Sequence, residues 1–272
     1  PGSIPAVAQG RVTVCDEASQ LAALALVRAP AGAAGRAGTA SGGRVRARHP
    51  ADAADQRAGG SLDGELWLDL CAGPGGKARL LAGLAAERGA RLVASDVRPH
   101  RAARVLDALR RGDHNHADHN RAELDAAVIA ADGRHAPWLP GTFDRVLADV
   151  PCSNLGSLRR RPEARWRKTP DDVPELAAIQ RDLLDVAIES VRPGGVVAYV
   201  TCSPHLAETR DVVTAVADRR GDVTILDAPA VLADVPRLDA FDPRFAQFWP
   251  HRHGTDAIFL SLLSRRSPPG RF

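Results

Sequence analysis

Two cysteines lie at the ends of apolar segments, where a thiol could act as a nucleophile. Cys202 ends the stretch V-V-A-Y-V-T-C-S-P, Val196–Pro204, and Cys152 comes shortly after the apolar segment Phe143–Ala148. Both segments predict buried strands, each stopped by a proline. Since α/β proteins bind ligands at the carboxyl ends of parallel strands, these thiols could face a ligand. Cys202 could equally be a small core residue, because free cysteine is among the most buried residue types.

A glycine-rich turn follows another predicted strand. The apolar segment Leu66–Leu70 leads into Cys71-Ala72-Gly73-Pro74-Gly75-Gly76-Lys77, and a helical pattern continues through Arg88. Glycines let the backbone approach a ligand closely, and a helix N-terminus offers free N–H groups. Strand, turn and helix together predict the first unit of a nucleotide-binding α/β sheet. The turn lacks the G-x-G-x-x-G spacing, which disfavours a dinucleotide dehydrogenase.

Acidic residues end three of the predicted strands. Asp96 follows Arg91–Ser95, Asp132 follows Val128–Ala131, and Asp149 follows the strand that precedes Cys152. An acid about 20 residues past a glycine turn commonly binds ribose hydroxyls, which is the position of Asp96.

A single predicted helix, Val173–Val191, connects the strand ending at Asp149 to the strand ending at Cys202. Strands joined in this way are commonly neighbours, about 5 Å apart. We therefore expect Asp149, Cys152 and Cys202 around one pocket.

A basic segment with one tryptophan extends from Leu158 to Lys168. Arginine binds phosphate and an indole can stack on a base, so the segment predicts a nucleic-acid surface. The candidate RNA-binding residues are Arg159, Arg160, Arg161, Arg165, Trp166, Arg167 and Lys168. A solvated loop anchored by its tryptophan is the alternative.

Three histidines lie close together in the segment His114–His119. They could hold a metal ion, but no neighbouring motif supports this, so we favour a solvated loop and predict no metal site.

The composition is that of an ordinary globular protein, with 272 residues and a net charge of +3. A mild basic excess permits an anionic partner without requiring one. The four cysteines form no C-x-x-C pair, and no apolar run could span a bilayer. We expect a cytoplasmic, monomeric protein with reduced thiols, no membrane association and no obligate protein partner. The chain contains no methionine, so a preceding domain could be missing from it.

The ordered set of motifs closely resembles the Sun/Fmu (RsmB-like) family of RNA cytosine-5 methyltransferases. The motifs are Asp16–Gln20 (DEASQ), Asp69–Lys77 (DLCAGPGGK), Asp149–Ser153 (DVPCS), Thr201–Pro204 (TCSP) and Pro250–Asp256 (PHRHGTD). The resemblance extends from about residue 10 to residue 265, apart from an insertion at 30–64. It implies S-adenosylmethionine as the methyl donor and RNA as the partner, most plausibly 16S-type ribosomal RNA.

The resemblance also implies roles for individual residues. Cys202 would be the nucleophile and Cys152 would assist release of the product, with Asp149 beside both. The donor would be bound by Cys71, Ala72, Gly73, Pro74, Gly75, Gly76, Lys77, Asp96, Asp132 and Asp149. Cys15 stands where the family usually has glutamine, and Asn154 where it usually has glycine. Bacterial members often carry an N-terminal RNA-binding domain resembling the antitermination factor NusB, and none is visible here.

The alternation of segments predicts an α/β fold. We expect a doubly wound, mostly parallel sheet of seven strands, Rossmann-like as in class I methyltransferases, with a small N-terminal helical extension. The expected divisions are an extension at 1–29, a mobile linker at 30–64, the methyltransferase domain at 65–265 and a tail at 266–272. The extension would contain the helix Glu17–Arg28.

Other substrates and a non-enzymatic role remain open. Transfer RNA is a possible substrate, whereas the cysteine of the T-C motif argues against DNA, whose cytosine methyltransferases use a P-C cysteine. A catalytically idle RNA-binding ribosome-assembly factor is the third reading. The intact Asp149, Cys152 and Cys202 argue against it, because a decayed site would be expected to lose them.

Overall fold

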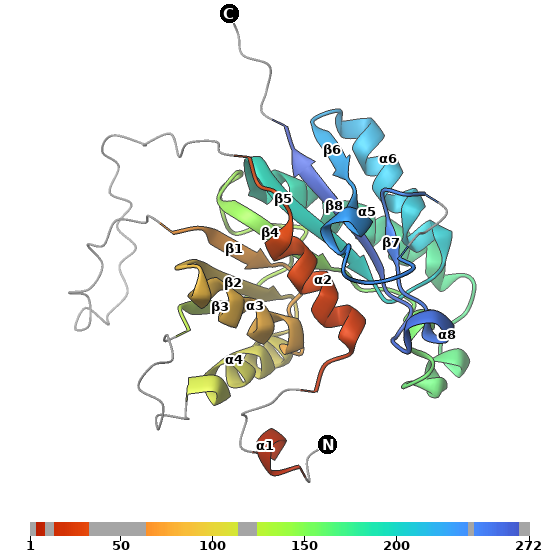
Figure 1. Cartoon of the computed structure of the whole chain (residues 1–272), viewed down its shortest axis with the longest axis horizontal. Coiled ribbons are helices and arrows are strands. Elements are labelled where there is room, and N and C mark those ends of the chain that lie inside the picture. Colours follow the sequence, from red (N-terminus) through yellow and green to blue (C-terminus); the bar gives the residue numbers. More distant parts are fainter. Residues whose placement is uncertain (1–3, 9–13, 33–63, 114–123, 239–241, 267–272) are drawn as a thin grey trace, which may run out of the picture.

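The chain forms one mixed sheet with helices packed on both faces (Figure 1). The structure is a computed structural model that describes residues 4–8, 14–32, 64–113, 124–238 and 242–266. Most of the expected linker, the segment His114–His119 and most of the tail lie outside the described residues.

The sheet has the strand order β3-β2-β1-β4-β5-β8-β6, with β7 paired to β8. Strands β3, β2, β1, β4 and β5 pair in parallel, and β8 runs antiparallel to its neighbours. The strands are β1 (Leu66–Asp69), β2 (Arg91–Asp96), β3 (Ala126–Ala130), β4 (Phe143–Asp149), β5 (Val191–Thr201), β6 (Val223–Leu226), β7 (Ala246–Gln247) and β8 (Phe259–Arg265). The Rossmann-like prediction is confirmed, and the two-residue β7 is an additional strand that the sequence did not indicate.

The helices divide between the two faces of the sheet, as expected for a doubly wound fold. Buried side chains of α2, α3 and α4 pack on one face, and those of α5 and α6 on the other (Figure 1). The α-helices are α1 (Pro5–Ala8), α2 (Glu17–Arg28), α3 (Gly76–Glu87), α4 (Pro99–Asp113), α5 (Asp172–Ser190), α6 (Arg210–Arg220), α7 (Ala228–Val231) and α8 (Pro250–His253). The 3₁₀ helices are η1 (Leu155–Ser157), η2 (Pro162–Trp166) and η3 (Leu206–Glu208).

Strand β5 departs from the predicted boundary at its start. The sequence places a turn at Pro193–Gly195 and begins the strand at Val196, whereas the strand starts at Val191. The register with β4 shifts across this stretch, and Gly194 has a φ of 80°. The turn is therefore an irregularity inside a longer strand.

Helix α2, in the expected N-terminal extension, has the predicted bounds, and its apolar face packs into the core. Its residues Ala22, Ala25 and Leu26 are fully buried and belong to the apolar cluster that includes α3 and the inner face of β5. A run of alanines allows this close packing, because alanine adds little bulk between helix and sheet.

Arg145 on β4 holds the C-terminal end of α2. Its guanidinium donates hydrogen bonds to the carbonyls of Leu26 at 2.6 Å and Ala29 at 2.9 Å, and to the carboxylate of Glu65 at 2.9 Å. The last carbonyls of a helix have no partners within the helix, so a buried cation satisfies them and also suits the helix dipole. Arg145 is only 6% exposed.

Substitution of this arginine tests the docking of α2. Arg145→Met keeps the length of the side chain but leaves the two carbonyls without this donor, and Glu65 with the Trp67 indole N–H alone. We expect the free energy of unfolding to fall by about 3 kcal/mol, measured by urea denaturation. Arg91→Met removes an exposed arginine whose nearest acid, Asp125, is 3.8 Å away. This control should cost less than about 1 kcal/mol, and equal losses in the two variants would contradict the anchoring role.

Candidate active site

One cavity of about 600 Å³ lies at the carboxyl ends of the parallel strands. The strand order reverses between β1 and β4, and ligands in open α/β sheets bind at such a switch point. The predicted residues on its wall are Cys71, Gly73, Pro74, Lys77, Asp96, Asp132, Asp149, Cys152, Arg160, Arg161 and Cys202. Ala72, Gly75 and Gly76 belong to the same turn but are not among the lining residues.

The glycine turn is folded tightly against the end of β2. A Cβ added at Gly73 would come within 2.3 Å of the Asp96 carboxylate and 2.5 Å of the Arg101 side chain. Gly75 has a φ of 110°, which side chains rarely adopt. The turn therefore requires glycine at both positions, and it leaves backbone at the cavity wall where a ligand can approach. This cradle and the adjacent acids fit a nucleoside-containing methyl donor.

Asp96 already has three partners from its own surroundings. It accepts hydrogen bonds from the backbone N–H groups of Gly73 at 3.1 Å and Arg98 at 2.9 Å, and it pairs with Arg101 at 3.2 Å. A carboxylate offers about four acceptor sites, so little capacity remains. Asp96 thus fixes the turn, and its binding of a ribose stays a prediction.

Asp132 also lines the cavity, beyond the end of β3. Its carboxylate accepts hydrogen bonds from both the side chain and the backbone N–H of Arg134. These hydrogen bonds lower the pKa of Asp132, so it is ionised at neutral pH. A contact with the adenine side of the donor stays a prediction.

Lys77 and Asp149 form an ion pair between the turn and β4. Lys77 Nζ lies 2.8 Å from the Asp149 carboxylate. Burial by itself would lower the pKa of Lys77, but the interaction with Asp149 outweighs it and raises the pKa. The pair links the predicted donor loop to the cysteine-bearing strand.

Asp69, at the end of β1, is buried beside this pair. Neither carboxylate oxygen has a hydrogen-bond partner among the described residues. The nearby Cys71 amide opposes the rise in the pKa of Asp69 but does not cancel it. Burial, followed by repulsion from Asp149, raises the pKa of Asp69 to about 8. Asp69 is therefore mostly protonated at neutral pH, which the sequence motif alone did not indicate.

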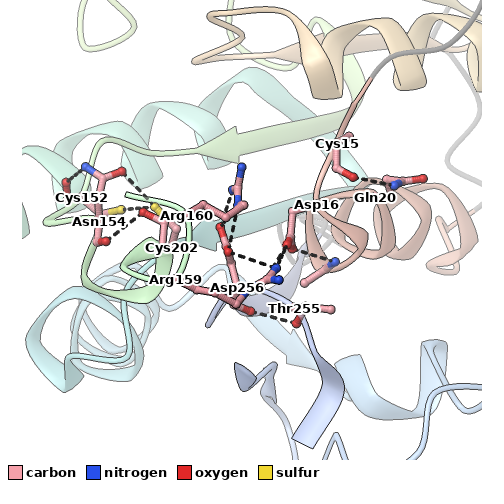
Figure 2. Close-up of polar contacts among 12 residues, drawn as sticks. Cys15, Asp16, Gln20, Cys152, Asn154, Arg159, Arg160, Cys202, Thr255 and Asp256 are labelled. Atoms are coloured by element: carbon pink, nitrogen blue, oxygen red, sulfur yellow. Dashed lines mark hydrogen bonds and ion pairs between the residues drawn. The ribbon is translucent and has the colours of Figure 1, made fainter. Parts of the chain in front are cut away.

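The two cysteines meet as expected. Parallel pairing aligns Asp149 with Val200, and the sulfur atoms of Cys152 and Cys202 lie 3.1 Å apart (Figure 2). Hydrogen bonding to Cys202, followed by burial, raises the pKa of Cys152 well above its ordinary value. Cys152 is thus held as a thiol, while Cys202 is half-buried at the cavity wall.

A buried glutamate behind the cysteines was missed by the sequence analysis. Glu208 accepts hydrogen bonds from Ser153 N–H at 2.7 Å, from Ser153 Oγ at 2.6 Å and from Ser203 Oγ at 2.6 Å. Each serine follows one of the two cysteines, so one carboxylate ties both cysteine loops together. The repeated Cys-Ser pair was the only sequence signal for this arrangement. The sequence around Glu208 predicts the exposed first turn of a helix, so it gave no sign of a buried carboxylate.

Three distant motifs converge next to the cavity. The Asp16 carboxylate caps α2 and also accepts hydrogen bonds from Arg159 and from the backbone N–H of Asp256 (Figure 2). Arg160 forms a bidentate ion pair with Asp256, whose side chain is 1% exposed. Arg159 and Arg160, predicted as RNA contacts, therefore hold the chain together here.

The remaining basic residues lie along the same segment. Arg161, Arg165 and Arg167 are exposed, and Trp166 is 84% exposed. The alternative interpretation of this segment required a tryptophan anchored in the core, and Trp166 is not anchored there. RNA contact by these residues and Lys168 stays a prediction.

Two further features concern only the described part of the chain. There, no group of histidine, cysteine and acidic side chains is arranged to hold a metal ion. Within the same residues, no helix is both long and apolar enough to cross a bilayer.

The model of the family described as 16S rRNA methyltransferase RsmB/F matches residues 61–264. The chain belongs to the RsmB/F family. The resemblance inferred from the motifs is thereby confirmed.

Relatives of this RsmB/F chain include longer proteins. A Mycobacterium tuberculosis protein with the provisional name of methyltransferase is 46% identical over 269 residues, which are 97% of this chain and 48% of that protein. Ribosomal RNA small subunit methyltransferase B of Erwinia tasmaniensis is 38% identical over 206 residues, 75% of this chain and 43% of the relative. The chain thus spans about half the length of these relatives, or less.

A solved structure supports the fold of this RsmB/F member. NSun6 from Pyrococcus horikoshii, solved with SFG, has a TM-score of 0.71 and 20% identity, and the match covers 98% of this chain and 56% of NSun6.

The raised pKa of Asp69 makes a prediction about stability. The folded protein keeps a proton that the unfolded chain loses near pH 3.8, so stability falls as the pH rises from there toward about 8. The slope is at most about 1.4 kcal/mol per pH unit. Asp69→Asn should remove this dependence. Urea denaturation at a series of pH values should show the free energy of unfolding of the wild type falling relative to that of the variant across this window. Parallel curves for the two proteins would contradict the prediction.

Proposed function

We propose that this chain transfers a methyl group from S-adenosylmethionine to carbon 5 of cytosine in RNA, specifically in small-subunit ribosomal RNA. The observation that carries the proposal is one cavity whose wall brings together a glycine turn, acidic residues and two adjacent thiols. The RsmB/F family description, the name of the Erwinia relative and a fold neighbour solved with SFG, an analogue of the donor, support it.

Cytosine needs a nucleophile because its carbon 5 is unreactive in the aromatic ring. Addition of the Cys202 thiolate to carbon 6 breaks the aromaticity and makes carbon 5 enamine-like. S-adenosylmethionine supplies the electrophilic methyl group that carbon 5 then takes. The addition places charge on the N3 side of the ring, where Asp149, held by Lys77, can share a proton.

Release of the product requires removal of the carbon-5 proton and elimination of Cys202. In the resting site Cys152 is held as the thiol, because its hydrogen bond to Cys202 and its burial raise its pKa, so it cannot accept a proton. Once Cys202 is bonded to carbon 6, the larger of these two upward influences is lost. The thiolate of Cys152 then forms more readily and can take the carbon-5 proton.

The target base must leave its stack to reach Cys202, so we expect flipped-out or single-stranded RNA. Arg161 lies on the cavity wall, and Arg165, Trp166, Arg167 and Lys168 continue along the same segment. These five residues are proposed RNA contacts, together with Arg159 and Arg160, whose side chains also pair with acids of this chain.

A methyl-transfer assay tests the activity. The protein in its full-length form is incubated with labelled S-adenosylmethionine and either unmodified small-subunit ribosomal RNA or transfer RNA. We expect label in cytosine of the ribosomal RNA. Label only in transfer RNA would change the substrate class, and donor binding without transfer to either RNA would support an idle assembly factor.

The division of labour between the thiols makes a second prediction. Cys152→Ala should accumulate a covalent RNA adduct, because addition proceeds and elimination fails, whereas Cys202→Ala should form none. Denaturing gel electrophoresis of protein with labelled RNA detects the adduct. Cys15→Ala, which removes a thiol outside this pair, is the control and should turn over without accumulating adduct. The reverse pattern would make Cys152 the nucleophile.

A further inference from the structure

We propose that Asn154 is a positioning residue that holds Cys202 as the neutral thiol in the resting site, aligned beside Cys152. The inference rests on the proposed function only in taking Cys202 as the reactive thiol.

The orientation of the Asn154 amide follows from its two partners. Its Nδ2 lies 2.9 Å from the carbonyl oxygen of Cys152, and its Oδ1 lies 3.1 Å from Cys202 Sγ (Figure 2). A carbonyl oxygen can only accept, so the NH₂ group must face Cys152. Oδ1 then faces the sulfur, and the S–H of Cys202 must be the donor.

The same reasoning identifies the donor in the hydrogen bond between the two sulfur atoms, which are 3.1 Å apart. Cys202 has one proton, and Asn154 holds it. The S–H of Cys152 must therefore donate to Cys202, which agrees with the raised pKa of Cys152. Asn154, Cys152 and Cys202 thus form a closed ring in which each donates one hydrogen bond and accepts another.

This ring opposes early loss of the Cys202 proton. A thiolate at Cys202 would still accept from Cys152, but it would face the lone pairs of the Asn154 oxygen. The amide cannot turn over to donate instead, because it would lose the bond to the Cys152 carbonyl and place its oxygen against that carbonyl. Activation therefore requires the contact to be broken when substrate enters.

The backbone fixes the amide in this place. Asn154 adopts left-handed φ and ψ values of 63° and 19° and caps η1. Two residues on, the Gly156 N–H donates to the carbonyl of Cys202 at 2.9 Å, and a Cβ at Gly156 would lie 2.8 Å from that oxygen. The loop is thus tied to the backbone of the same cysteine that its amide contacts. Asn, Asp and Gly all tolerate a left-handed backbone, so all three can be compared without strain.

The test measures alkylation of Cys202 by iodoacetamide at constant neutral pH, followed by peptide mass spectrometry. Only the thiolate reacts, so an acceptor that holds the proton slows the reaction. Asn154→Gly should raise the Cys202 rate about three- to tenfold, the usual range for one hydrogen bond. Asn154→Asp should lower the rate, because a carboxylate repels a thiolate.

Ser157→Ala is the matched control. It removes a hydroxyl that donates to the backbone carbonyl of Asn154, in the same loop, without touching either sulfur. The Cys202 rate should not change in this variant, and the rates at Cys15 and Cys71 should stay constant in all variants.

Equal Cys202 rates in the wild type and both Asn154 variants would overturn the inference, as would a general rise at all four cysteines, which would indicate a loosened loop. The measurement uses neither RNA nor methyl donor. A wild-type protein that fails to methylate RNA would count against the proposed function, but the alkylation rates could still be interpreted.

Discussion

The parallel pairing of β4 with β5 is the constraint on which the site depends. Neighbouring strands in a sheet lie about 5 Å apart, so residues just beyond two paired carboxyl ends must share a wall. Here the pairing ends with Asp149 opposite Val200, and the chain beyond each end delivers a cysteine. Glu208 then fixes the two loops through Ser153 and Ser203. The sulfur contact is therefore set by backbone hydrogen bonds and one buried carboxylate, and not by the cysteines themselves.

The carboxyl ends of three adjacent strands carry acidic groups. Asp69, Asp96 and Asp149 end β1, β2 and β4, with Arg101 in contact with Asp96 and Lys77 in contact with Asp149. Protonation of Asp69 relieves part of the repulsion among them. Each of the three acids is thus either paired with a cation or protonated, which lets them lie close together beside the cavity.

Local patterns predicted much of this structure, and tertiary pairing decided the rest. The strand ends, the glycine turn and both cysteines could be read from the sequence, because apolar runs and glycines act over a few residues. The core position of α2 could not, since its alanine-rich face has no partner until the sheet forms. The ion pairs of Arg159 and Arg160 could not be predicted, because their carboxylate partners are far away in sequence. Glu208 and Asn154 gained their roles only from the loops that they meet.

The Asp16 contacts also set an order in which the protein can be completed. Asp16 lies 143 residues before Arg159 and 240 residues before Asp256, yet one of its carboxylate oxygens binds both. During synthesis α2 emerges before both partners, and its N-terminal end cannot acquire them until Asp256 has emerged. This wall of the cavity is therefore completed late. Until the strands that α2 packs against have also emerged, its apolar face stays exposed, and transiently exposed apolar surface is prone to aggregation.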